Sequence, residues 1–197
     1  MNYKNAIYIG AKEKESLIDL EIPKQFNGQI IIFIHGFMGF KDWGAWNLVQ
    51  QFFTVKGYGF CKFNTSHNGG TISDGIDFPD PKSFSLNTYS NEIEDVKAVV
   101  NWIDSKVDLW SGHLIGHSKG GAVALIAGNA IEITRSISTW ASIASIEDRF
   151  PIGSSLEEWK STGVRTIKNG RTLQDLPQGI VLWEDFQKHK STYDLKK

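Results

Sequence analysis

The chain has 197 residues, and its 41% hydrophobic and 22% charged residues are typical of one folded domain rather than of a disordered segment. Its 21 Lys and Arg offset 22 Asp and Glu to a net charge of -1, which argues against nucleic acid or an anionic membrane as a partner. The sequence has no apolar run long enough for a membrane span or a signal peptide, so we expect a soluble cytoplasmic protein. The one cysteine, Cys61, excludes an intrachain disulfide and fits a small buried residue.

Short apolar segments in the first third of the chain predict β-strands at residues 5–9, 16–22, 29–34 and 60–63. The first two, separated by Gly10 and a charged stretch, are typical of an antiparallel hairpin. The run at 29–34 has no polar alternation, which indicates a central strand covered on both faces. A helix is expected over residues 42–53, with Asp42 at its N-terminal cap.

The middle of the chain alternates between helical and strand-like patterns. After a long polar loop, the sequence predicts a helix at 91–103, a strand ending at 114–116, a helix of small residues at 119–130 and a strand at 136–144. This alternation predicts an α/β protein with a mostly parallel sheet flanked by helices.

The character of the sequence changes after Asp148. Residues 150–197 carry scattered aromatic side chains without a clear strand–helix unit, and residues 179–183 form the one strand-like run of note. Trp159 and Trp183 in this segment fit either a pocket lining or plain core packing. We therefore divide the chain into an α/β core at residues 1–149 and a C-terminal segment at residues 150–197.

The strongest candidate for chemistry is the run Gly116-His117-Ser118-Lys119-Gly120, which fits the pattern G-x-S-x-G between an apolar strand and a helix of small residues. A serine in so sharp a turn has a strained backbone and an exposed hydroxyl. The glycines let neighbouring elements pass closely, and the start of the helix offers free N–H groups to a developing negative charge. The pattern predicts Ser118 as a nucleophile.

A second glycine-containing turn, His35-Gly36-Phe37-Met38-Gly39, follows the strand at 29–34 and precedes a helix. Both turns stand at the C-terminal end of a predicted strand, which is where α/β sheets bind ligands. With the two motifs in this order, residues 5–148 resemble the α/β-hydrolase family, in particular its serine esterases and aminopeptidase-like members with an HGF-type oxyanion loop.

The resemblance implies that Ser118 attacks an ester, or an amide, and that the backbone amides of Phe37 and Lys119 form the oxyanion hole. It implies a small-molecule ester or peptide-like substrate, an acyl-enzyme, no metal and no cofactor. Residues 150–197 resemble the cap that such enzymes insert after the sixth strand. Lys119 departs from the Gln or Met that relatives often carry, which indicates a more polar pocket floor.

The same resemblance leaves the other two triad residues unplaced. The family orders its triad as Ser, then Asp or Glu, then His, and only His189 follows Ser118. His189 stands four residues after Asp185, which is more typical of a solvated helical pair, and Asp148 is more typical of a turn. The last two strand–loop units of the fold are not found before Lys197, so we expect the acid and the histidine beyond residue 197 and little turnover by the present chain.

Three other interpretations are weaker or stay open. A metal site at His67 with Asp74, Asp77 and Asp80 matches no familiar spacing of ligands. A catalytically inactive binding module with the same fold, and a serine peptidase in place of an esterase, are alternatives that the residues do not separate. The sequence predicts no oligomeric state.

Overall fold

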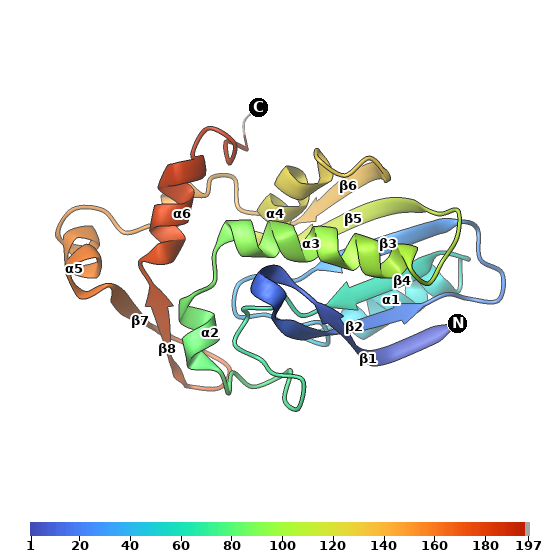
Figure 1. Ribbon diagram of the computed structural model, residues 1–197, viewed down its shortest axis with the longest axis horizontal. Helices are drawn as coiled ribbons and strands as arrows, with labels where there is room; N and C mark the ends of the chain where they lie inside the picture. Colours follow the sequence, from blue (N-terminus) through green and yellow to red (C-terminus); the bar gives the residue numbers. More distant parts are fainter. Residues whose placement is uncertain (196–197) are drawn as a thin grey trace.

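The computed structural model describes residues 1–195 and shows one six-stranded sheet (Figure 1). Its strands are β1 (Asn2–Ile9), β2 (Glu15–Glu21), β3 (Gln29–Ile34), β4 (Gly59–Phe63), β5 (Ser111–His117) and β6 (Thr134–Trp140), in the spatial order β1-β2-β4-β3-β5-β6. β2 pairs antiparallel with both β1 and β4, whereas β3, β4, β5 and β6 run parallel. The predicted leading hairpin and mostly parallel sheet are confirmed.

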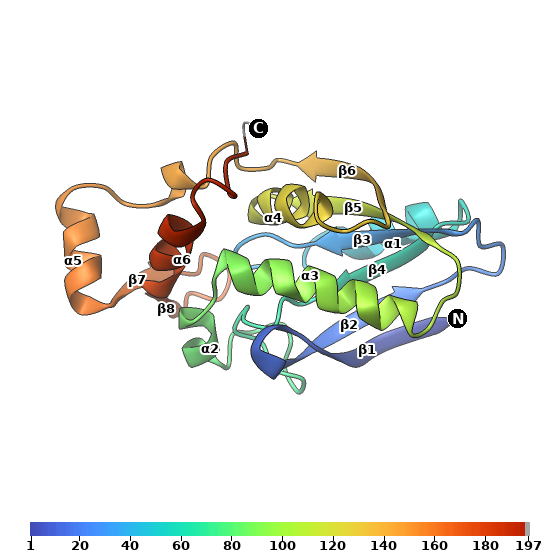
Figure 2. The same ribbon diagram turned by 45° about the horizontal axis from the view of Figure 1, so that its top comes forward.

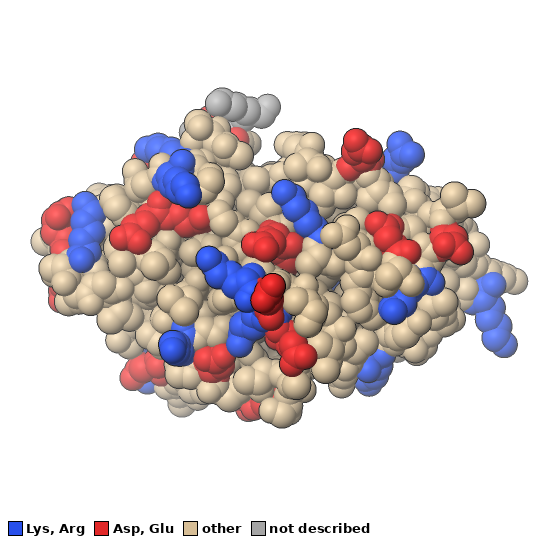
Figure 3. Space-filling model, viewed as in Figure 1, with Lys and Arg blue, Asp and Glu red and all other residues tan. Residues whose placement is uncertain are grey.

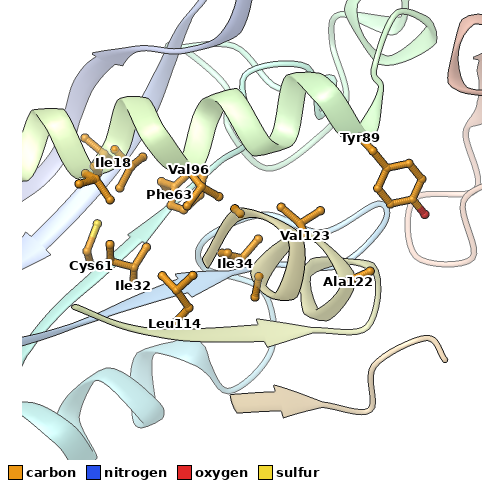
Figure 4. Close-up of a cluster of buried hydrophobic side chains, with 14 of the residues drawn as sticks. Ile18, Ile32, Ile34, Cys61, Phe63, Tyr89, Val96, Leu114, Ala122 and Val123 are labelled. Atoms are coloured by element: carbon orange, nitrogen blue, oxygen red, sulfur yellow. The ribbon is translucent and has the colours of Figure 1, made fainter. Parts of the chain in front are cut away.

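Helices cover both faces of this sheet (Figure 2). On one face lie α3 (Tyr89–Asp104) and α4 (Lys119–Gly128), and on the other lies α1 (Trp46–Thr54). The larger core, drawn in Figure 4, joins strand residues such as Ile32 and Leu114 to Val96 of α3 and Val123 of α4. Cys61 is buried in this core as expected. The parallel strands are apolar on both faces because both faces are covered.

The C-terminal segment forms a separate layer beyond the carboxyl ends of the parallel strands (Figures 1 and 2). It consists of α5 (Ser154–Thr162), the antiparallel pair β7 (Val164–Lys168) and β8 (Asp175–Gly179), and α6 (Val181–His189). Short helical turns complete the chain at η1 (Ala11–Glu13), α2 (Pro81–Ser85) and η2 (Glu147–Arg149). No helix within residues 1–195 combines the length and apolar character needed to cross a membrane.

Two local predictions are wrong. Residues 179–183 end β8 and begin α6, because Leu182 and Phe186, one helical turn apart, are the side chains that the segment buries. The helix expected over 42–53 begins only at Trp46. Asp42 does not cap it, since the Asp42 carboxylate instead pairs with the ammonium groups of Lys41 and Lys62.

A buried carboxylate on α3 fixes two loops near the carboxyl ends of the strands. Asp95 is completely buried, and its two oxygens accept hydrogen bonds from the backbone amides of Ala11 and Ser66, each at 2.8 Å. Burial raises the pKa of Asp95 to about 7, against the opposing effect of these two amides.

This shift gives stability a defined pH dependence. Because the folded-state pKa of Asp95 of about 7 lies above an unfolded value of about 3.9, the folded protein holds the extra proton between these limits. The contribution of Asp95 to the free energy of unfolding is therefore greatest below about pH 4, and it falls by up to about 1.4 kcal/mol per pH unit until pH 7.

Urea denaturation at a series of pH values measures this slope. Asp95→Asn does not titrate, so this variant is expected to lose the slope, although it is less stable throughout because an amide nitrogen then meets a backbone N–H. Glu94→Gln, an exposed neighbour on the same helix, is expected to keep the slope. A slope that is equal in all three proteins would show that Asp95 does not titrate in this range.

Candidate active site

Ser118 stands at the turn from β5 to α4 with a backbone that is rare for an L-residue, at φ 54° and ψ -119°. Neighbouring backbone holds it there: the Ser118 amide donates to Trp140 O at 3.0 Å, and the Ser118 carbonyl accepts from Gly121 N at 3.0 Å. The side chain is half-buried, and no residue within 1–195 makes a hydrogen bond to its hydroxyl. The predicted sharp strand-to-helix turn with an accessible hydroxyl is thus what the structure shows.

The two motif glycines allow backbone segments to touch at this turn. A Cβ atom added at Gly116 would lie 2.2 Å from the carbonyl oxygen of Gly120. A Cβ atom added at Gly120 would lie 2.4 Å from the carbonyl oxygens of both Ile34 and His35. Real Cβ contacts are never so short, so α4 approaches the end of β3 this closely only because residue 120 is glycine. In the same way, the end of β5 approaches the start of α4 only because residue 116 is glycine.

The loop of residues 35–39 passes directly beside Ser118. A Cβ atom at Gly36 would lie 3.0 Å from the Ser118 Cβ. His35 is buried and holds this loop with both ring nitrogens, since Nε2 accepts from the Thr65 amide at 3.1 Å and Nδ1 lies 2.9 Å from Gly36 O. Burial lowers the pKa of His35, which keeps its ring neutral. His35 therefore positions the loop, and its nitrogens are not free to act as a base.

Two backbone amides beside Ser118 have no partner within residues 1–195. The Phe37 amide, in the loop after β3, donates no backbone or side-chain hydrogen bond there. The Lys119 amide is the first of α4 and has no carbonyl one turn earlier to bind. The N-terminal end of α4 also carries the positive end of the helix dipole. The structure thus places the predicted donors on two different crossover connections, one after β3 and one after β5.

The side chain of Lys119 has a buried anionic partner. Its Nζ lies 2.7 Å from Glu92 Oε1 on the first turn of α3, and both side chains are less than a tenth exposed. The ammonium group also lies 4.7 Å from the ring centroid of Tyr89. The floor near Ser118 is more polar than that of an all-apolar pocket, but the carboxylate of Glu92 compensates the charge of Lys119.

Two hollows of about 270 and 260 Å³ adjoin Ser118, and both are lined by Phe37 and Ser118. The first, which we call the cap-side hollow, extends to Arg165 and Gln178 of the β7–β8 pair. The second, the tryptophan-side hollow, is bounded by Trp43, Trp46, His117 and the β7–β8 turn. The C-terminal segment therefore contributes to the lining of both hollows. Trp159 and Trp183 line neither hollow, and Trp159 is buried by packing.

His117 is the histidine with a free ring in a hollow that also contains Ser118. Its ring packs on Trp46 with centroids 5.0 Å apart, and partial burial lowers its pKa. Within residues 1–195, no hydrogen bond joins this ring to the Ser118 hydroxyl. Its place in the motif, next to Ser118, was visible in the sequence, but the packing of its ring on Trp46 was not.

The other candidate acid and base residues lie away from Ser118. His189 Nε2 lies 4.0 Å from Asp185 Oδ1 on α6, and neither residue lines a hollow with Ser118. Asp185 is less solvated than expected, because it accepts a hydrogen bond from the Ser90 amide at 3.1 Å at the start of α3. Asp148 lies in the η2 turn, where its amide donates to Ser145 Oγ. No described histidine or acid is thus hydrogen-bonded to the Ser118 hydroxyl.

Three of the side chains considered as metal ligands have other partners in the structure. Asp80 pairs with Lys14, Asp77 pairs with Arg171, and the His67 ring is hydrogen-bonded to Ser66. Within residues 1–195, no three His, Cys, Asp or Glu side chains gather closely enough to hold a metal ion.

The fold is shared with solved structures. A protein from Agrobacterium vitis S4 assigned as a hydrolase superimposes with a TM-score of 0.73 over 95% of this chain and 71% of its own, at 16% identity. The esterase domain of a Rhodothermus marinus protein matches with a TM-score of 0.61 over 95% and 68%, at 15% identity. A lidless α/β serine hydrolase from Xanthomonas campestris matches with a TM-score of 0.56 over 78% and 65%, at 16% identity. No family model and no curated protein sequence matches the chain.

The chain has the α/β-hydrolase fold. In this chain the fold has the strand order β1-β2-β4-β3-β5-β6, and a sharp turn at Ser118 follows β5. The chain spans between about 65% and 71% of the lengths of these three structures. At such low identities the likeness establishes the fold, and activity has to be argued from the site itself.

Proposed function

We propose that the protein is a serine hydrolase of the carboxylesterase type, in which Ser118 is the nucleophile and the amides of Phe37 and Lys119 form the oxyanion hole. The observation that carries the proposal is the Ser118 backbone at φ 54° with an unbonded hydroxyl beside the 35–39 loop. A strained turn persists where the surrounding structure holds it, and such turns cluster at active sites. Esterases and hydrolases among the structural neighbours support the same class.

The chemistry follows from this arrangement. Ser118 Oγ attacks the ester carbonyl carbon, and the carbonyl oxygen becomes an oxyanion that the two amides stabilise. Collapse of this intermediate breaks the ester C–O bond, releases the alcohol and leaves an acyl-enzyme, which water hydrolyses to the acid. Removing one such donor in a well-studied protease costs about 100- to 1,000-fold in kcat.

The proton of Ser118 needs a general base, which the described residues do not supply in hydrogen-bonded form. We propose that the general base is not among the described residues, because no histidine ring within residues 1–195 makes a hydrogen bond to Ser118 Oγ. The proposal therefore expects little or no ester turnover from the chain as given. Ester hydrolysis that is abolished equally by Ser118→Ala and by His189→Ala, or by His117→Ala, would show that one of these histidines is the base and would contradict the proposal.

Labelling of the full-length protein with a fluorophosphonate probe, followed by mass spectrometry, tests the proposal. We expect one adduct on the peptide that contains Ser118 and none in Ser118→Ala. Ser142→Ala, which removes a serine from the loop after β6, serves as a matched control and should label normally. Absence of any adduct on Ser118 would favour a catalytically inactive binding module. Faster hydrolysis of peptides than of matched esters would favour a peptidase.

A further inference from the structure

The cap-side hollow next to Ser118 has a lining of one charge sign. Its charged side chains are Lys119, Arg149 and Arg165, and no Asp or Glu lines it. The outer surface differs, because Lys, Arg, Asp and Glu are interspersed over the face drawn in Figure 3. The lining of the hollow therefore has an excess of cationic side chains that the face drawn in Figure 3 does not have.

Two of these three charges are uncompensated within residues 1–195. Lys119 pairs with Glu92, as described above. Arg149, at the end of η2, is exposed and makes no ion pair or hydrogen bond through its guanidinium group there. Arg165 makes no ion pair with any described carboxylate. An anion entering this hollow therefore finds two cations without displacing an existing partner.

Arg165 is held in a fixed orientation. Its Nε donates to Gln178 Oε1 at 2.8 Å, and its guanidinium group lies 4.2 Å from the ring centroid of Trp159. Trp159 is itself fixed, because its Nε1 donates to Gln178 O at 2.9 Å. These contacts leave the two terminal nitrogens of Arg165 without a hydrogen bond among the described residues, and a planar guanidinium fork suits the two oxygens of a carboxylate. Partial burial removes some of the hydration of this charge and lowers the pKa of Arg165.

From these contacts we infer that the cap-side hollow binds a carboxylate on the acyl part of the substrate, so that the substrate is a monoester of a short dicarboxylic acid. The inference rests on the proposed function, because Ser118 lines the same hollow and supplies the point of attack. Ser118 Oγ forms a bond to the ester carbonyl carbon, the C–O bond to the alcohol breaks, and the alcohol takes a proton. Water then releases the dicarboxylate. The hollow of about 270 Å³ holds a chain of a few carbons with its terminal carboxylate.

The test is binding to Ser118→Ala, where an ester is not consumed. Monomethyl glutarate, which carries one free carboxylate, is compared with dimethyl glutarate, its neutral counterpart, by NMR titration. We expect the monoanion to bind at least about tenfold more tightly, because hydrogen bonds to charged groups are roughly twice as strong as neutral ones. This preference is expected to disappear with Arg165→Gln, to fall with Arg149→Gln and to be partly kept with Arg165→Lys.

Two controls keep this test decisive. Lys168→Gln removes a cation from the same strand, where Lys168 is exposed and pairs with Asp175, and it should leave the preference unchanged. Arg149→Gln removes a side chain without a described partner, so its fold should persist even if Arg165→Gln destabilises the β7–β8 pair. Equal binding of the two esters, or a preference that survives Arg149→Gln combined with Arg165→Gln, would overturn the inference. Selective binding without fluorophosphonate labelling of Ser118 would support the carboxylate site and contradict the hydrolase proposal.

Discussion

Gly120→Ala is expected to destabilise the protein by more than about 4 kcal/mol or to prevent folding. The added methyl group would lie 2.4 Å from two backbone carbonyl oxygens, those of Ile34 and His35. Neither oxygen can move alone, because Ile34 pairs with Gly116 across the sheet and His35 holds the loop beside Ser118. Relief of the clash would therefore separate α4 from the end of β3.

Urea denaturation of Gly120→Ala and of Gly170→Ala measures this effect. Gly170 lies in the turn between β7 and β8, where an added Cβ atom meets no atom within 4 Å. We expect the Gly170 variant to change the free energy of unfolding by no more than about 0.5 kcal/mol. Similar denaturation midpoints for the two variants would contradict the close approach of α4 to β3.

Asp19→Ala is expected to cost about 3–5 kcal/mol, as is usual when one member of a buried ion network is removed. The Asp19 carboxylate accepts from Lys41 Nζ at 2.9 Å and lies 3.5 Å from Lys62 Nζ. Both lysine side chains are only 2% exposed. Removal of Asp19 leaves the half-buried Asp42 as the anion facing two buried cations.

The matched control for this variant is Asp175→Ala. Asp175 pairs with Lys168 at 3.2 Å, but both side chains are more than half exposed. Exposed pairs contribute about 1 kcal/mol at most. A loss in Asp19→Ala no greater than that in Asp175→Ala would mean that the network of Asp19, Lys41 and Lys62 is solvated in the folded protein.

Local sequence patterns predicted the strands and helices that carry Ser118. The apolar run at 29–34 and the glycine-flanked serine encode their structures in a few consecutive residues, and β3 and the β5–α4 turn have the expected form. The sequence marked residues 150–197 as a separate cap-like segment but did not predict its β7–β8 pair, because Val164–Lys168 exposes every second residue and has no apolar core pattern. Likewise, Asp42 had the residue type and position of a helix cap, and its ion pair with Lys62 joins residues 20 positions apart.

The features of the candidate site also differ in whether local sequence patterns or distant contacts determine them. Ser118, Phe37 and Lys119 lie in motifs within single turns, so one sequence was enough to propose them as site residues. The charge of the cap-side hollow depends on Arg149 at the end of the α/β core and on Arg165 of the C-terminal segment, and both are far from Ser118 in the sequence. The compensation of Lys119 by Glu92 is equally non-local, since it joins the first turns of α4 and α3. Such contacts between distant residues leave no signal in one sequence.

A crystal structure of the phosphonylated protein would show whether the Ser118 oxygen faces two backbone donors. The phosphonyl oxygen mimics the oxyanion of the tetrahedral intermediate. We expect this oxygen to lie about 2.7–3.1 Å from the amide nitrogens of both Phe37 and Lys119. A phosphonyl oxygen that contacts neither amide, or an adduct on a residue other than Ser118, would contradict it.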